Sequence, residues 1–126
     1  MIQSFIADDN YRVTHSNGRH VLYADEPPEK GGKDTAPTPD ELLEAALASC
    51  TLVTLRMYTS HKQWNVGEIK VKVSLVREKE KTIITRELYF EHAVSAEQQQ
   101  RLAQVAKACP VSKTLANASE LSVEIK

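Results

Sequence analysis

Alternating apolar and polar residues predict two antiparallel strand pairs in this chain. The first pair lies within residues 11–26, "YRVTHSNGRHVLYADE", where two β-prone runs meet at Asn17-Gly18, a dipeptide favoured in tight type I′ turns. The second pair lies within residues 67–92, where the charged turn "REKEK" joins two alternating runs. The apolar faces of these runs are Ile69, Val71, Val73 and Leu75, and Ile84, Leu88 and Phe90. The pattern predicts antiparallel sheet with one solvated face.

A long helix is predicted between the two strand pairs. Residues 27–39 hold four of the five prolines and are expected to form a loop. At the end of this loop, Thr38 and Glu41 have the spacing of a capping box, and Pro39 stands at a position that helices tolerate. Apolar residues then fill nearly every face, so this helix should be buried on all sides and should end near "SHKQWN", residues 60–65.

Two shorter helices and a strand are predicted after the second strand pair. Ser95 and Gln98 form another capping box, and a break at Cys109-Pro110 starts a short helix through "VSKTLANA". The final segment, "ELSVEI", alternates as a strand whose inward side chains are Leu121, Val123 and Ile125. The predicted order is β-β-α-β-β-α-α-β, an α+β fold of antiparallel sheet around one apolar helix, in a single domain of residues 1–126.

Composition narrows the classes of function. Hydrophobic residues make up 41% of the chain and charged residues 26%, and the net charge is −1. This balance offers no electrostatic footprint for nucleic acid or an anionic membrane, and the lysines of "KVKVSLVREKEK" are interpreted as a solvated strand face. The N-terminus lacks the pattern of a signal peptide, and the apolar run includes Glu44 and Arg56, so a cytoplasmic location is the expectation.

The two cysteines are the candidates for chemistry. Cys50 and Cys109 are 59 residues apart, which matches no zinc-site spacing, and four scattered histidines add no metal motif. We therefore expect no metal site. In a cytosolic protein such a pair is free thiols, a redox couple or a catalytic pair.

Cys50 has two interpretations. Its neighbours on the same helix face are mostly apolar, which is typical of a cysteine that serves only as packing. If Cys50 reacts, its activation must come from another segment, and an arginine is the favoured candidate. Asp40 lies about 15 Å before Cys50 along the helix. Asp40 and Glu41 could orient such an arginine, or they could only stabilise the positive end of the helix.

Cys109 stands directly before Pro110, at or next to the N-cap of the short helix. Unpaired N–H groups there favour a thiolate, although packing at a helix junction would also explain the residue. Two cysteines in complementary settings suggest a peroxidatic and resolving pair, in which one thiol is oxidised to sulfenic acid and the other condenses with it.

Three segments together resemble the OsmC/Ohr family, the osmotically induced and organic hydroperoxide resistance proteins. They are "TPDELLEAALASC", "CPVSKTL" and "GRHVLYADEPPEKGGKDTAPTP". The last segment looks like the loop that leads into the first long helix in the OsmC-like branch of the family. The resemblance implies an intertwined homodimer with active sites at its interface. It also implies a thiol peroxidase of oxidative or osmotic stress defence, with no bound cofactor and a dithiol such as dihydrolipoamide as reductant.

Carried over by residue, the resemblance makes Cys50 the nucleophile and Cys109 the resolving thiol. Asp40 falls where Ohr has its glutamate, and Glu41 matches relatives that have the acid one residue later. Ohr enzymes also carry a catalytic arginine in a "GGRDG"-like turn, which this chain lacks. Arg12 and Arg19 are then the candidates for that cation. The missing motif motivates an alternative function, a non-catalytic dimer that binds a small ligand.

Overall fold

The computed structural model describes residues 1–126, which form two compact units, Met1–Ala45 and Ala46–Lys126. The first unit contains a three-stranded antiparallel sheet in the order β1-β2-β3, followed by a 3₁₀ turn and the first residues of helix α1. The elements are β1 (Gln3–Ile6), β2 (Val13–Ser16), β3 (Val21–Ala24) and the 3₁₀ turn η1 (Pro28–Lys30). The hairpin and the proline-rich loop are therefore where the sequence predicted them.

The turn between β2 and β3 differs in one detail from the prediction. The Asn17 N–H donates to the His20 carbonyl, so Gly18 and Arg19 are the two central residues rather than Asn17 and Gly18. Gly18 has a φ of +90°, and Arg19 is not among the residues with positive φ. A type I′ turn needs positive φ at both central positions, whereas a type II′ turn needs it only at the first. The hairpin is thus confirmed with its turn displaced by one residue.

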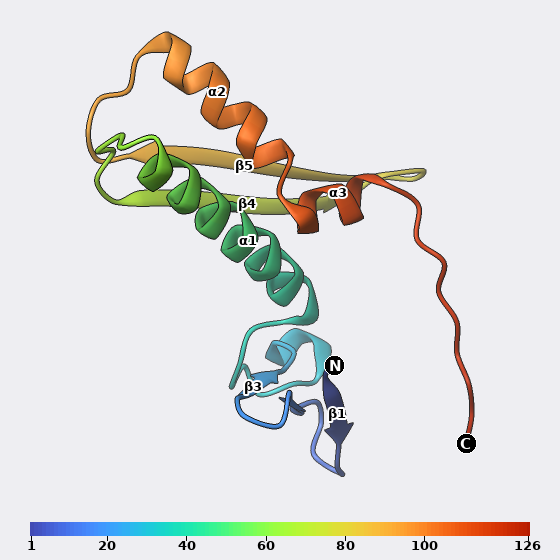
Figure 1. Cartoon of the computed structure of the whole chain (residues 1–126). Coiled ribbons are helices and arrows are strands. Elements are labelled where there is room, and N and C mark those ends of the chain that lie inside the picture. The colour runs from blue at the N-terminus through green and yellow to red at the C-terminus, as the bar shows by residue number, and fades with distance from the viewer. The chain divides into compact units, whose positions relative to one another are not determined.

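The second unit packs helices on a long hairpin (Figure 1). Strands β4 (Ile69–Arg77) and β5 (Thr82–Phe90) pair antiparallel over their whole length, and the apolar faces are those expected from the alternation. Most of α1 (Pro39–His61) lies in this unit, with α2 (Ala96–Lys107) and α3 (Pro110–Ala116). A core of Leu55, Leu102 and Ala106 joins α1 to α2 against the hairpin. Both predicted capping boxes are present.

Helix α1 is covered on one side only within the chain. It buries every fourth residue, namely Leu47, Thr51, Leu55 and Thr59. Val53 and Met57, in contrast, are 53% and 68% exposed. The expectation that this helix is buried on all sides is therefore not met by one chain alone, although its end at His61 is as predicted.

The α+β class with antiparallel sheet and three helices is confirmed, but the order of strands is not β-β-α-β-β-α-α-β. The strand β1 was missed because its residues, "QSFI", do not alternate apolar and polar, whereas the equally short β2 and β3 were marked by the turn between them. Residues 121–125 form no strand, and Leu121, Val123 and Ile125 are each at least 90% exposed. A strand needs a neighbour to bond its backbone groups, and this segment pairs with no strand of its own chain. None of the helices has the length and apolar character to span a membrane.

Candidate active site

The two cysteines, far apart in the sequence, meet in the second unit. Cys50 lies in α1 and is partly exposed, whereas Cys109 is the N-cap residue of α3 and is 0% exposed. Both are free thiols, and the Cys50 thiol hydrogen-bonds to the Cys109 sulfur. The structure thus brings the predicted pair of thiols into contact, and the roles assigned to each remain predictions.

A cation that the sequence analysis missed also reaches this pair. The Arg86 guanidinium, on β5, lies with its Nη1 atom 4.0 Å from the Cys109 sulfur. The same Nη1 donates to Thr51 Oγ1 at 3.0 Å and to the Ala106 carbonyl at 2.9 Å. Nη2 donates to Ser112 Oγ at 3.0 Å. Arg86 therefore ties α1, the end of α2 and the start of α3 to the hairpin beside the buried thiol.

The signal for Arg86 was present in the alternation of β5. In "TIITRELYF" the inward positions are even-numbered, and Arg86 falls between Ile84 and Leu88 on the apolar face. A charged residue at such a position must find partners inside the protein, because leaving a charge buried and unpaired costs several kcal/mol. Each residue was interpreted by its strand alone, so the sequence analysis did not single out Arg86.

The surroundings of Cys109 favour its ionised form. Burial raises the pKa of the Cys109 thiol, but the backbone N–H of Ser112, the Cys50 thiol, the Thr51 hydroxyl and the Arg86 charge together lower it by more. The net result is a pKa below the usual range for cysteine. The contacts of Cys109 thus favour ionisation of its thiol.

Thr51 links the arginine to the Cys109 sulfur. Its hydroxyl carries one proton, which it donates to the Leu47 carbonyl at 2.7 Å while it accepts from Arg86. Thr51 Oγ1 also lies 3.9 Å from the Cys109 sulfur. When Cys109 is ionised, the Thr51 hydroxyl has two possible acceptors, the Leu47 carbonyl and the Cys109 sulfur. Because it has a single proton, rotation of the hydroxyl decides to which of them it donates.

The other predicted site residues belong to the first unit. Arg12 stacks over the Tyr23 ring at 4.0 Å and donates to the Thr35 carbonyl, and Arg19 lies in the β2–β3 turn. Asp40 stands in the first turn of α1.

Glu41 completes the capping box with Thr38, whose backbone N–H and hydroxyl lower the pKa of the Glu41 carboxyl. For Glu41 the helix-capping interpretation is confirmed. A role of Arg12, Arg19 or Asp40 at Cys50 stays a prediction.

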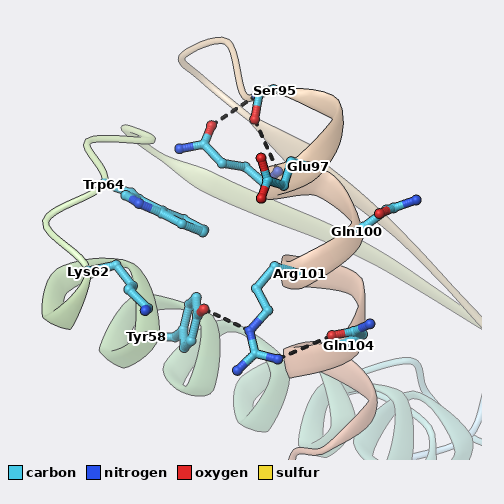
Figure 2. A pocket seen from close by; sticks show the side chains of 9 residues that line it. Tyr58, Lys62, Trp64, Ser95, Glu97, Gln100, Arg101 and Gln104 are labelled. Carbon is cyan, nitrogen blue, oxygen red and sulfur yellow. Dashed lines mark hydrogen bonds between the residues drawn. The ribbon is translucent and has the colours of Figure 1, made fainter.

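Two cavities of the second unit differ in chemistry. A cavity of about 210 Å³ reaches Arg86 and Ser112, and its apolar walls are Leu47, Ile84 and Leu115. A larger, open one of about 690 Å³ lies between α1 and α2 and contains no cysteine (Figure 2). Its lining includes Tyr58, Lys62, Trp64 and Arg101. Nowhere in the chain do three or more His, Cys, Asp or Glu side chains gather as a metal ion would need.

Comparison with known proteins gives the same family as the fold and the thiol pair. A model of the family described as OsmC-like protein matches residues 31–124. No curated protein matches the chain significantly.

Solved structures share its fold at low identity. A putative osmotic stress induced and detoxification response protein from Psychrobacter arcticus 273-4 aligns with a TM-score of 0.76 and 20% identity, over 90% of this chain and 85% of that one. The OsmC-like protein from Mycoplasma pneumoniae aligns with a TM-score of 0.72 and 18% identity, over 92% and 86%. The organic hydroperoxide resistance protein OhrB of Bacillus subtilis aligns with a TM-score of 0.64 and 21% identity, over 90% and 89%. Because the family model matches well over half of the residues, the chain belongs to the OsmC-like protein family.

Proposed function

We propose that this protein is a thiol peroxidase that reduces organic hydroperoxides in stress defence. The observation that carries the proposal is the contact between the Cys50 thiol and the Cys109 sulfur in an OsmC-like chain. Cys50 attacks the hydroperoxide and becomes a sulfenic acid, releasing the alcohol. Cys109 then condenses with the sulfenic acid to form a disulfide, and an external dithiol such as dihydrolipoamide reduces the disulfide by thiol exchange.

Exposure supports this division of roles. A hydroperoxide arriving from solvent meets Cys50, which is partly exposed, before Cys109, which is 0% exposed. The small cavity has apolar walls and is bordered by Arg86, which contacts Cys109, and this suits a substrate with an organic group. The relatives named for organic hydroperoxide resistance point to the same class of substrate.

A homodimer is part of the proposal. The exposed Val53 and Met57 of α1, and the exposed apolar residues of the C-terminal segment, are surfaces that a second copy of the chain would cover. A strand from residues 121–125 could form by pairing with such a copy. Met57→Glu should then shift the protein from dimer towards monomer in sedimentation, whereas Lys70→Glu on the solvated strand face should not. A monomeric wild type would contradict the dimer.

A cytoplasmic location is also proposed, since two neighbouring free thiols persist in a reducing compartment.

The catalytic proposal is tested by following the loss of an organic hydroperoxide with dihydrolipoamide as reductant. Wild type should consume hydroperoxide over many turnovers, and Cys50→Ser should not. If wild type and Cys50→Ser consume hydroperoxide equally slowly, the peroxidase proposal is wrong.

A second candidate function, binding of a small ligand without catalysis, is favoured by the larger cavity. Its volume of about 690 Å³ lies within the range of small-molecule sites. Figure 2 shows Lys62 and Arg101 on either side of Tyr58, and Arg101 Nε donates to the Tyr58 hydroxyl at 2.8 Å. Two cations beside aromatic rings suit a small aromatic acid.

Trp64 is the only tryptophan of the chain and borders this cavity, so its fluorescence reports directly on binding. Saturable quenching by a small aromatic acid such as salicylate, lost in Arg101→Gln, would support this function. No change in wild type would dismiss it.

A further inference from the structure

Arg86 makes one contact, with the Cys109 sulfur, that its hydrogen bonds between the elements do not explain. Its two short Nη1 bonds, to Thr51 and to the Ala106 carbonyl, use both hydrogens of that nitrogen. The remaining approach, to the Cys109 sulfur at 4.0 Å, is therefore an electrostatic contact of a fixed cation with a sulfur atom. A neutral side chain could supply donors to a carbonyl and a hydroxyl, but it could not supply this charge.

The groups around Cys109 come from three elements. Cys50 and Thr51 approach from α1, Arg86 from β5, and the Ser112 N–H from the first turn of α3. Among these contacts only Arg86 carries a charge. Cys50 also hydrogen-bonds to Cys109, and this contact helps to lower the pKa of the Cys109 thiol.

We propose that Arg86 is the positioning residue of the thiol pair, which holds Cys109 as the resting thiolate so that Cys109 serves first as the base for Cys50 and then as the attacking thiolate in disulfide formation. This inference rests on the proposed peroxidase function for its chemistry, but its electrostatic part concerns the resting protein alone. It answers which cation this chain uses in place of the "GGRDG"-like arginine, and it assigns that cation to the second thiol rather than to the first.

The two steps balance as follows. As Cys50 attacks, its proton passes to the Cys109 sulfur, the O–O bond of the hydroperoxide breaks, and Cys50 becomes a sulfenic acid. The leaving alkoxide takes the proton from Cys109 and departs as the alcohol, which restores the Cys109 thiolate. Cys109 then attacks the Cys50 sulfur, an S–S bond forms, the S–O bond breaks, and the hydroxide that leaves takes a proton from solvent. The two thiols are oxidised to a disulfide while the hydroperoxide is reduced to alcohol and water.

The first arm of the test measures the Cys109 thiolate without any hydroperoxide. In a Cys50→Ser background, Cys109 is the only cysteine, and the ultraviolet absorbance of its thiolate is followed as a function of pH. Arg86→Gln should move the midpoint of this titration upward, and Arg86→Lys, which keeps the charge, should restore it in part. Arg56→Gln removes a cation that binds the Gly67 carbonyl instead, and should leave the midpoint in place.

A purely structural clamp would give a different result. Ser112→Ala removes the Nη2 hydrogen bond of Arg86 but keeps both the charge and the Ser112 N–H, so it should lower stability with little shift of the midpoint. If Arg86→Gln loses stability as Ser112→Ala does and titrates like its parent, Arg86 is only a clamp and the proposal is wrong. If Arg86→Gln does not fold, Arg86→Lys decides the question. This variant keeps the positive charge, so a Cys109 titration midpoint at the usual value for cysteine would also overturn the proposal.

The second arm follows the oxidation steps in the otherwise wild-type chain, with a sulfenic-acid trap and peptide mapping at neutral pH. Arg86→Gln should slow disulfide closure by about tenfold or more, since contacts with charged groups are the strong ones, and trapped Cys50 sulfenic acid should accumulate. Closure at the wild-type rate would overturn the role of Arg86. If no variant and no wild-type sample oxidises at all, the peroxidase function fails while the titration still decides whether Arg86 controls the Cys109 thiolate.

Discussion

Each unit of the chain buries one acidic group among hydrogen-bond donors, and the two sites are built differently. In the first unit Asp25, 2% exposed, accepts from the backbone N–H groups of Tyr11, Glu26 and Thr35 and from the Thr35 hydroxyl. In the second unit Cys109 contacts an N–H, a hydroxyl, a thiol and the cation Arg86.

The difference follows from the acids themselves. A carboxyl is ionised at neutral pH without help, so neutral donors are enough to hold the Asp25 charge inside the protein. The Thr35 hydroxyl, the Thr35 N–H and the Glu26 N–H lower the pKa of Asp25 far below its usual range, against the opposing effect of burial. A thiol is neutral by default, and burial favours that form, so the low pKa of Cys109 takes the Ser112 N–H, Cys50 and Thr51 together with the Arg86 charge.

The comparison also separates a structural site from a reactive one. Asp25 joins β3 to the loop at Thr35 and to Tyr11, and all its partners are groups that neither gain nor lose protons in the working range of pH. Cys109 has the Cys50 thiol as a partner, and a thiol can be both deprotonated and oxidised. Asp25, whose partners are all neutral donors, has a structural role. Cys109, which hydrogen-bonds to a second thiol, can take part in redox chemistry.

The largest expected effect on the reactive side is that of the first thiol. Cys50→Ser should reduce hydroperoxide consumption to the rate measured without protein, because the serine hydroxyl is a far weaker nucleophile than a cysteine thiolate. Cys109→Ser should still reach the Cys50 sulfenic acid in a single turnover and stop there, but more slowly than wild type, because the base for Cys50 is gone. A rapid mixing experiment with a sulfenic-acid trap distinguishes the two variants, and turnover by Cys50→Ser would break the assignment of roles.

The core beneath the reactive site gives the next largest effect, on stability. Leu55 is 0% exposed and packs with Leu102 and Ala106, so Leu55→Ala should lower the free energy of unfolding by about 2–5 kcal/mol in urea titrations. Val76→Ala, on the exposed side of β4, is the control and should change it by no more than about 0.5 kcal/mol. Equal effects of the two substitutions would mean that this core does not support the unit.

Asp25 provides the pH-dependent test on the structural side. Its pKa is lower in the folded chain than in the unfolded one, so ionised Asp25 stabilises the fold above the unfolded value of about 3.9. That contribution is lost progressively as the pH falls from there towards the folded pKa. Wild type should therefore lose stability in acid more steeply than Asp25→Asn, which should already be less stable at neutral pH.

Asp9→Asn, at an exposed position, serves as the control for this experiment and should follow the wild-type curve. Parallel acid profiles of wild type and Asp25→Asn in thermal unfolding would contradict the view that Asp25 is held as an anion.

The smallest expected effects are those of the two helix N-caps, one at the start of α1 and one at the start of α2. Thr38 caps α1 and Ser95 caps α2, each within a capping box. Thr38→Ala and Ser95→Ala should each cost about 1 kcal/mol of stability in denaturant titrations. Thr38→Ser and Ser95→Thr keep a hydroxyl and should cost less. If an alanine variant is as stable as its hydroxyl-bearing counterpart, the cap at that helix contributes nothing measurable.

Local signals predicted most of the elements from the sequence. Capping boxes, the proline-rich loop and the alternation of β4 and β5 depend on neighbours along the chain, and these predictions are confirmed. The strand expected at residues 121–125 failed because a strand also depends on a neighbour in space, which one chain does not provide. The exposure of Met57 has the same origin.

The candidate site was predictable only in part, for a similar reason. Cys50 and Cys109 could be found from their motifs, but the contact between Cys109 and Arg86 arises from the packing of α3 on β5. The position of Arg86 on an apolar strand face was visible in the sequence. Its contact with Cys109 was not visible, since this contact depends on how α1, β5 and α3 pack together.

The most direct test of the central claim is a titration of the reduced protein with a sub-stoichiometric amount of organic hydroperoxide, followed by peptide mapping of the cysteines. We expect a single disulfide between Cys50 and Cys109, formed in proportion to the hydroperoxide added. Survival of both free thiols, or oxidation of Cys50 to sulfinic acid with Cys109 left free, would contradict it.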